Sequence, residues 1–251
     1  MSAASRRWPW ERLAQSNAPS HELLVGALEP RPGERWLDIG TGAGGTALRA
    51  TRAGALVTGV DIAEEAVAAA RKAAREEGVD GRFDVADVQA LPFEDAAFDV
   101  VASAFGANFA TDHARAAREL ARVCRAGGRL GMTLMPMDSR AGELSTLIRT
   151  YEAEGDHPAA WANNVDGLLG RWFDLDVRRV QSPMEEKQES AEEAWEFMSS
   201  ALGQLADLVA KLDAVETAEL RDRFLAIHSR YEGRPKSYVL VLGTRSDAEA
   251  S

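Results

Sequence analysis

The stretch that decides the fold is "WLDIGTGAGGTAL", residues 36–48, in which an apolar segment leads into four glycines within six positions and then into a helix-like run. Residues without a Cβ let the chain turn sharply at the carboxyl end of a strand, so that a ligand can lie against bare backbone at a helix N-terminus. Gly40, Gly42 and Gly45 satisfy the dinucleotide pattern G-x-G-x-x-G, and Asp61 follows about twenty residues later. The loop predicts an adenosyl ligand and leaves the kind of ligand open.

On both sides of this loop, short apolar segments alternate with helical ones. The strands expected up to residue 135 are 35–39, 55–60, 81–87, 98–105 and 129–135, the last entered by a turn at Gly127 and Gly128. The helices expected between them begin near residues 44 or 45, at 63 and at 112. This alternation predicts an α/β fold with a parallel sheet that is covered on both faces.

Beyond Pro136 the alternation ends. Residues 140–172 have an amphipathic helical pattern, 173–180 read as a strand, 190–212 and 215–231 as two long helices, and "SYVLVLGT" near the end as a last strand. We expect one domain over residues 1–251, because this length suits one sizeable core and no low-complexity linker interrupts it.

Composition excludes several classes of function. The 29 basic and 40 acidic residues give a net charge of -11, which repels nucleic acid. Cys124 is the single cysteine, and the four histidines lack metal-ligand spacing, so we expect neither a disulfide nor a metal site. No signal peptide and no apolar run long enough to span a bilayer is evident, which indicates a cytoplasmic protein without a membrane partner.

Two carboxylates near the predicted sheet edge bear on the choice of ligand. Asp38 lies two residues before Gly40, where its charge would repel a pyrophosphate and attract an ammonium or a sulfonium group. Asp87 follows the third strand, where it could accept a hydrogen bond from an adenine amino group while Val88 contacts the ring. A nicotinamide site does not require this arrangement.

Four segments in order and spacing carry a resemblance: "LDIGTGAGG", "VTGVDIAEEAV", "DVQALPFEDAAFDVV" and "RVCRAGGRLGMT". They resemble the successive motifs of the class I S-adenosylmethionine-dependent methyltransferases, especially the type 11 subset that acts on small molecules. The resemblance covers residues 33–135 well and the remainder loosely. One departure is Ala126, where the family usually has proline.

The resemblance implies a Rossmann-like sheet of seven strands with helices on both faces, whose last strand, here residues 237–245, runs antiparallel. Residues 1–32 would form an N-terminal helical flap that includes Trp8 and Trp10, residues 33–135 the cofactor-binding core, and residues 136–172 and 186–233 helical insertions at the acceptor site that act as a lid. The cofactor would be S-adenosyl-L-methionine, which leaves as S-adenosyl-L-homocysteine after in-line methyl transfer to a small-molecule acceptor.

The resemblance also implies residue roles. Asp38 would orient the glycine loop, and Gly40 and Gly42 would approach the methionine portion of the cofactor. The remaining assignments are Asp61 for the ribose hydroxyls, Ile62 and Val88 for the faces of adenine, Asp87 for its edge, and Ala104 and Phe105 for the side from which the methyl group leaves.

Structural roles compete with several of these assignments. Asp61 would also cap the helix that follows it, and Asp38 would serve equally well by bonding loop amides. Asn108 and His113 are the candidates for orienting an acceptor and for a general base, against turn capping and ordinary packing. The sequence leaves the acceptor, the methylated atom and the oligomeric state open.

Two other functions compatible with the same residues are a protein that binds S-adenosylmethionine without methyl transfer and a nicotinamide-dependent oxidoreductase. The intact set Asp38, Gly40, Asp61 and Asp87 favours catalysis over binding alone, because a degenerate site is expected to lose one of them.

Overall fold

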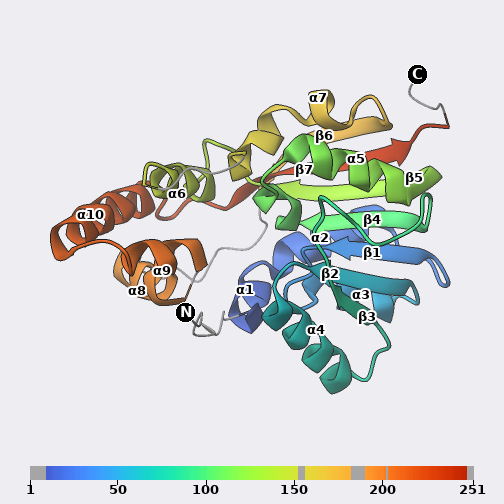
Figure 1. The fold of residues 1–251 in the computed structure, drawn as a ribbon, viewed down its shortest axis with the longest axis horizontal. Helices are drawn as coiled ribbons and strands as arrows, with labels where there is room; N and C mark the ends of the chain where they lie inside the picture. Colours follow the sequence, from blue (N-terminus) through green and yellow to red (C-terminus); the bar gives the residue numbers. More distant parts are fainter. Residues whose placement is uncertain (1–9, 152–155, 182–189, 202, 248–251) are drawn as a thin grey trace.

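The computed structural model describes residues 10–151, 156–181, 190–201 and 203–247. Its centre is one sheet of seven strands in the order β3-β2-β1-β4-β5-β7-β6 (Figure 1). The strands are β1 (Arg35–Ile39), β2 (Leu56–Asp61), β3 (Arg82–Val85), β4 (Phe98–Ala104), β5 (Cys124–Leu134), β6 (Phe173–Gln181) and β7 (Ser237–Arg245).

Strand direction defines one functional edge of the sheet. Strands β3, β2, β1, β4 and β5 pair in parallel, and β7 runs antiparallel between β5 and β6. This confirms the predicted seven-stranded sheet with an antiparallel last strand. The carboxyl ends of the parallel strands therefore meet at one edge, and the chain order changes direction there between β1 and β4, which is where open α/β sheets bind ligands.

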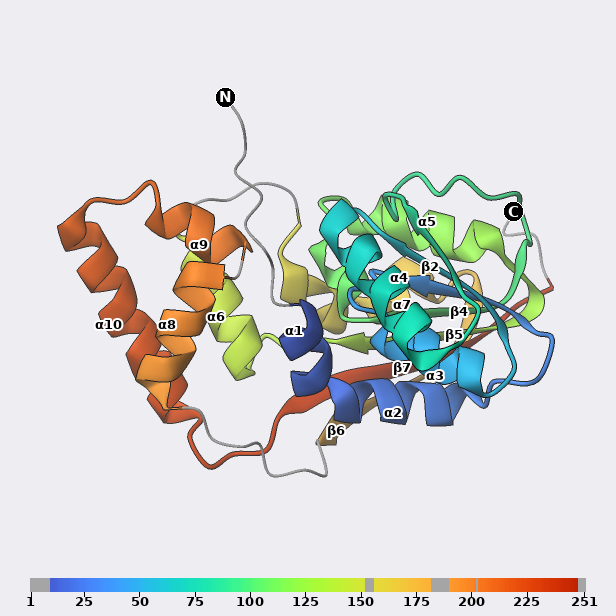
Figure 2. The ribbon, with the colours of Figure 1, turned by 90° about the horizontal axis from the view of Figure 1, so that it is seen from below.

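Helices cover both faces of the sheet, as the buried character of its strands requires. One face carries α2 (Ala18–Leu28), α3 (Gly45–Arg52) and α4 (Glu64–Glu77), whose apolar residues share a core cluster with Trp36. The other face carries α5 (His113–Val123), the 3-10 turn η2 (Pro158–Asn163) and α7 (Val165–Leu169), which pack with Leu130 and Met132. Figure 2 shows α2 and α5 on opposite sides of the sheet.

A second group of helices has its own apolar cluster. It consists of α6 (Arg140–Arg149), α8 (Ala191–Ala201), α9 (Gly203–Val209) and α10 (Ala214–Arg230), which pack around Trp195, Leu220 and Phe224. Helix α6 follows the end of β5 and α10 precedes the start of β7, so the group stands at the carboxyl edge of the sheet (Figure 1). The helix α1 (Trp10–Ser16) lies between this group and the sheet (Figure 2).

The structure differs from the sequence pattern in two segments. Strand β5 begins at Cys124 and passes through Gly127 and Gly128, because a shift in register between Phe98 and Val100 absorbs the extra residues. The helical pattern over 140–172 consists of the separate elements α6, η2 and α7, whereas the helical pattern over 190–212 corresponds to α8 and α9, on either side of residue 202, which lies outside the described residues. Periodicity alone does not reveal such breaks, because short helices share one apolar stripe.

The N-terminal helices also have different positions. Helix α2 packs on the sheet through Leu24 and Leu28, whereas α1 contacts α2 and α4 beside the glycine loop. In the described part of residues 1–32, α2 therefore belongs to the helical cover of the sheet, and the flap stays a prediction. Trp8 lies outside the described residues.

Candidate active site at the carboxyl edge of the sheet

The glycine loop uses left-handed backbone at three of its glycines. Gly40, Gly42 and Gly44 have φ values of 64°, 54° and 86°, a region that side chains with a Cβ rarely adopt. At Gly40 space is decisive as well, because a Cβ there would lie 2.5 Å from Cα of Gly106. The loop after β1 thus rests directly on the backbone that follows β4, in the 3-10 turn η1 (Gly106–Phe109).

Gly45, the third glycine of the dinucleotide pattern, has a different purpose. A Cβ on Gly45 would lie 2.1 Å from the imidazole ring of His21, so the missing side chain makes room for a histidine of α2. Burial, reinforced by the charge of Arg49, lowers the pKa of His21 to about 4, which leaves the ring neutral at neutral pH. Gly45 therefore allows a packing contact, and because the third glycine of the dinucleotide pattern also serves packing, it does not distinguish the two kinds of ligand.

Asp38 lies beneath the loop and organises it. Its Oδ2 accepts hydrogen bonds from Oγ1 of Thr41 (2.7 Å) and from the backbone N–H of Ala47 (3.2 Å). Burial raises the pKa of the Asp38 carboxyl to about 7, although these two bonds oppose the rise and the charge of Asp61 adds to it. The first bond ties the end of β1 to the glycine loop, and the second ties it to the first turn of α3.

Asp61 ends β2 and faces the loop. Its Oδ2 accepts a hydrogen bond from the backbone N–H of Gly42 (3.0 Å), and its Oδ1 accepts one from the N–H of Ala63 (3.0 Å). Burial raises the pKa of Asp61, and the bonds from Ala63 and Gly42 oppose that rise. Asp61 caps the following helix only in part. It accepts the N–H of Ala63, but α4 begins after Ala63 and has no side-chain cap.

Asp87 follows the third strand, one residue after Ala86, which bonds to Asp61. The backbone N–H of Ala86 donates to the carbonyl of Asp61 (3.0 Å), which holds the ends of β2 and β3 together. The backbone N–H of Gln89 (2.8 Å) and its side-chain amide both donate to the carboxylate of Asp87. Val88 packs partly against the core, whereas Ile62 is 71% exposed.

Ala104 ends β4 and Phe105 follows it, on the side of β1 opposite to β2. Phe105 has a φ of 63° and leads into η1, with its ring in edge contact with Tyr238. In η1, Asn108 is completely buried, and its backbone carbonyl lies 3.1 Å from Nε2 of His113. The two candidates for acceptor chemistry are therefore neighbours.

Helix α1 covers the loop. The ring of Trp10 lies 3.8 Å from the position of a Cβ on Gly42. Glu11 forms an ion pair with Lys72 of α4 (3.3 Å), and the guanidinium of Arg12 lies 3.7 Å from the ring centre of Phe197 in α8. Helix α1 thus contacts the glycine loop, α4 and α8.

The structure brings the predicted residues to one edge, although their ligand roles remain predictions. Strand order places Asp38, Asp61 and Asp87 at the ends of adjacent strands. Sequence reasoning missed Gly106 and His21, which shape the loop from outside its motif. A glycine directly after a predicted strand was the available signal for Gly106, while nothing local to His21 indicated its contact with Gly45.

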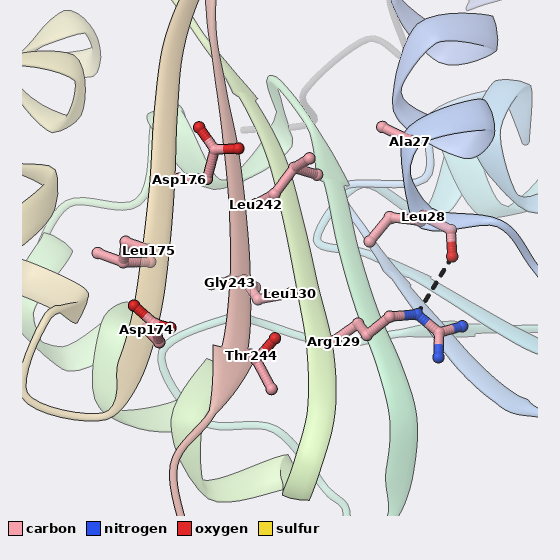
Figure 3. Close-up of a pocket in the computed structure, with 10 residues that line it drawn as sticks. All are labelled: Ala27, Leu28, Arg129, Leu130, Asp174, Leu175, Asp176, Leu242, Gly243 and Thr244. Carbon is pink, nitrogen blue, oxygen red and sulfur yellow. Dashed lines mark hydrogen bonds between the residues drawn. The ribbon is translucent and has the colours of Figure 1, made fainter.

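A shallow cavity of about 240 Å³ lies elsewhere on the sheet. Figure 3 shows its lining by residues of β5, β6, β7 and the end of α2, including Arg129, whose Nε donates to the carbonyl of Leu28 (3.2 Å). These residues lie toward the starts of β5 and β6 and the end of β7, which is the opposite edge from the glycine loop. The cavity is separate from the candidate site.

Two features are absent from the part of the chain that the structure describes. Within residues 10–151, 156–181, 190–201 and 203–247, no group of three or more His, Cys, Asp or Glu residues is arranged to hold a metal ion. Over the same ranges, no helix has the length and apolar character needed to cross a membrane.

Known sequences similar to this chain include a methyltransferase domain family and a methyltransferase. The model of a family described as a methyltransferase domain matches residues 37–132. An uncharacterized protein of Mycobacterium tuberculosis is 33% identical over 223 residues, which cover 85% of this chain and 81% of that protein. The demethylmenaquinone methyltransferase of Thermus thermophilus is 42% identical over 127 residues, or 50% of this chain and 57% of that protein.

Solved structures show the same fold. The cyclase SpnF has a TM-score of 0.63 at 23% identity and covers 93% of this chain and 82% of its own. A geranyl diphosphate methyltransferase in complex with S-adenosylmethionine has a TM-score of 0.58 at 20% identity, with 91% and 85% of the two chains covered. At these identities the likeness concerns the fold.

Proposed function

Because the chain belongs to the class I S-adenosylmethionine-dependent methyltransferases, we propose that it transfers a methyl group from that cofactor to a small, partly apolar acceptor. The observation that carries the proposal is the position of Asp61 beside Gly42. A carboxylate at the end of β2 meets a loop of left-handed glycines at the carboxyl edge, so that an acceptor for hydroxyl groups and bare backbone contacts are available side by side.

The residues at this edge fit S-adenosylmethionine. Each oxygen of Asp61 accepts one backbone bond, which leaves acceptor capacity for ribose hydroxyls. Ile62, although large and apolar, is 71% exposed, and an adenine ring would cover it. Asp87 would accept the adenine amino group, while Gly40 and Gly42 would admit the methionine portion. Asp38 would act through Thr41 and Ala47 on the shape of the loop.

When bound, this cofactor supplies a methyl carbon that is activated by a positively charged sulfur. The protein has to align the acceptor atom with that carbon and exclude water, and such alignment is worth on the order of 7 to 11 kcal/mol. Ala104 and Phe105 would form the wall beside the reacting atoms. The outer helices α6, α8, α9 and α10 at the same edge would shield the acceptor from solvent.

The acceptor class is supported by the surroundings of the site and by one relative. Phe109, at the end of η1, is 56% exposed and offers apolar surface beyond the wall formed by Phe105. The net charge of -11 disfavours a nucleic-acid acceptor. The Thermus thermophilus relative is named for a demethylmenaquinone, which is a small molecule.

The test begins with the cofactor. Thermal-shift measurements with S-adenosylmethionine, S-adenosylhomocysteine and NAD should show stabilisation by the first two, because a ligand that binds only the folded state raises its stability. Release of S-adenosylhomocysteine in the presence of a panel of small acceptors then measures methyl transfer. Stabilisation by NAD alone would favour the nicotinamide-dependent oxidoreductase and contradict the proposal.

A second candidate function is a fold that holds the cofactor without transferring its methyl group. The observation in its favour is the likeness to SpnF, which is described as a cyclase. That candidate predicts binding of S-adenosylmethionine and no release of S-adenosylhomocysteine with any acceptor in the panel.

A further inference from the structure

Buried polar atoms without partners gather near the candidate site. Most buried side-chain nitrogen and oxygen atoms in proteins form hydrogen bonds, and leaving one unpaired costs about 1 to 3 kcal/mol. Within the described residues, such atoms include His21 Nδ1, Trp36 Nε1, Asn108 Oδ1 and Nδ2, Thr133 Oγ1 and Trp161 Nε1. His21 contacts the glycine loop, and Asn108 and Thr133 lie at the ends of β4 and β5. Trp161 lies in η2, which contacts η1, and Trp36 lies in β1.

Asn108 is the most pronounced case. Asn108 is 0% exposed, and neither Oδ1 nor Nδ2 of its side-chain amide has a partner. It follows Phe105 by one turn of η1, and its own N–H donates to the Phe105 carbonyl (3.1 Å). The amide is therefore carried on the turn that begins where β4 ends, beside the expected point of methyl transfer.

His113 holds this turn in place. Its Nε2 lies 3.1 Å from the Asn108 carbonyl oxygen, and because a carbonyl only accepts, Nε2 must carry the proton. Burial lowers the pKa of His113, so the neutral ring has its lone pair on Nδ1, which lies 3.9 Å from the carboxylate of Asp156. The basic nitrogen is thus turned toward Asp156, which favours a positioning role over that of a general base.

Trp161 adds a second unpaired donor. It is completely buried in η2, its Nε1 has no partner, and its ring centre lies 5.0 Å from that of His113. His113 therefore contacts both the turn of Asn108 and the ring of Trp161, and the two 3-10 turns pack on one another. This cluster, Asn108–His113–Trp161, offers one acceptor and two donor groups without a net charge.

We propose that the Asn108–His113–Trp161 cluster forms the polar end of the acceptor site and selects an acceptor with an uncharged hydroxyl group on an apolar body. The inference rests on the proposed methyltransferase function and specifies its substrate class. Asn108 is the residue that contacts the acceptor, Trp161 supplies a further donor, and His113 is a positioning residue.

The preference for an uncharged group follows from the cost of burying charge. An ammonium, a carboxylate or a phosphate beside the Asn108 amide would lose its hydration and meet uncharged groups there, because the half-exposed carboxylate of Asp156 lies at Nδ1 of His113 whereas Asn108 lies at Nε2. A hydroxyl group both donates and accepts one bond, which matches Oδ1 and Nδ2 of Asn108. Its removal from water is then compensated.

The experiment uses three probes with the same apolar body: naphthol, naphthoate and naphthylmethylammonium. Their dissociation constants are measured by ligand-observed NMR on the full chain saturated with S-adenosylhomocysteine. We expect naphthol to bind at least about tenfold more tightly than either charged probe. Comparable affinity for the three probes, preference for a charged one, or no naphthol binding would overturn the proposal.

Matched variants identify the residues. Asn108→Leu removes both polar atoms, Trp161→Phe removes only the N–H donor, and Asn163→Leu makes the same change as the first at an exposed position of η2. Naphthol affinity should fall roughly fivefold or more in the first two variants and stay within about twofold in the third. Unchanged naphthol affinity in Asn108→Leu would show that this amide holds only an internal water and would overturn the proposal.

His113 is tested by rescue. His113→Leu should weaken naphthol binding while S-adenosylhomocysteine binding stays unchanged, and His113→Gln, which retains a side-chain N–H, should restore most of the naphthol affinity. Equal loss in both variants would contradict the positioning role. Calorimetry with S-adenosylhomocysteine on every variant keeps the two proposals apart. A wild type that does not bind S-adenosylhomocysteine contradicts the methyltransferase function and with it this inference, whereas a wild type that binds it and does not bind naphthol contradicts this inference alone.

Discussion

The carboxylate of Asp61 and the backbone N–H of Gly42 are joined by a hydrogen bond of 3.0 Å, although 19 positions separate them in the chain. This bond ties the end of β2 to the glycine loop after β1 and leaves lone pairs of the carboxylate available to a ligand. A change at Asp61 should therefore alter both the loop and the binding of ribose hydroxyls.

Asp61→Ala is expected to weaken S-adenosylhomocysteine binding roughly tenfold or more, about 1.4 kcal/mol, without unfolding the protein. Calorimetric titration measures the effect. Asp80→Ala is the matched control, since Asp80 is exposed ahead of β3 and should leave the affinity unchanged. Normal affinity in Asp61→Ala would show that the ribose assignment is wrong.

Gly40→Ala is expected to destabilise the protein by at least about 1 kcal/mol more than Gly78→Ala. The two glycines have similar φ values, 64° and 66°, so both substitutions introduce the same backbone strain. A Cβ at Gly78 meets no atom within 4 Å, whereas one at Gly40 would lie 2.5 Å from Cα of Gly106. Urea denaturation of the two variants isolates the clash, and equal stabilities would contradict it.

The buried carboxyl of Asp38 should make stability depend on pH. Its pKa is raised from 3.8 to about 7, so the folded protein holds a proton that the unfolded chain releases, and this contribution is lost as pH rises through that interval. Asp38→Asn has no such proton. We expect the stability of the wild type, relative to Asp38→Asn, to be higher at about pH 5 than at about pH 7.5.

Urea denaturation of both proteins without cofactor at the two pH values measures this difference. The comparison cancels the contribution of His21, which is present in both proteins. Each unit of pKa displacement corresponds to about 1.4 kcal/mol, which sets the scale of the effect. A difference between the two proteins that is independent of pH would contradict the proposed titration of Asp38.

Trp10 should report on the cofactor site and contribute to it. Its ring lies on the backbone of Gly42, where the methionine portion is expected, so a bound cofactor should change its environment. We expect Trp10→Phe to remove most of the change in tryptophan emission on titration with S-adenosylhomocysteine, and Trp10→Ala to weaken binding roughly fivefold, about 1 kcal/mol. Trp172→Phe, near the start of β6, is the control and should retain the signal.

Much of the core could be predicted from short-range pattern. The strands of 35–104, the glycine loop and the carboxylates at strand ends depend on residues close together in the chain, and the sheet contains them in the expected places. The limits of β5 and the division of residues 140–172 into α6, η2 and α7 could not be predicted, because they depend on strand register and on packing against other elements.

By itself the sequence determined that this is an α/β protein with a glycine-lined turn after its first strand and a carboxylate at the end of its second, because apolar periodicity and missing Cβ atoms act locally. Only the tertiary structure decided that Gly40 rests on Gly106, that Gly45 makes room for His21, and that the amide of Asn108 is buried without a partner. Each of these facts depends on a contact, or on the absence of one, between segments that meet only when the sheet has formed. Local sequence patterns do not predict such contacts between distant segments.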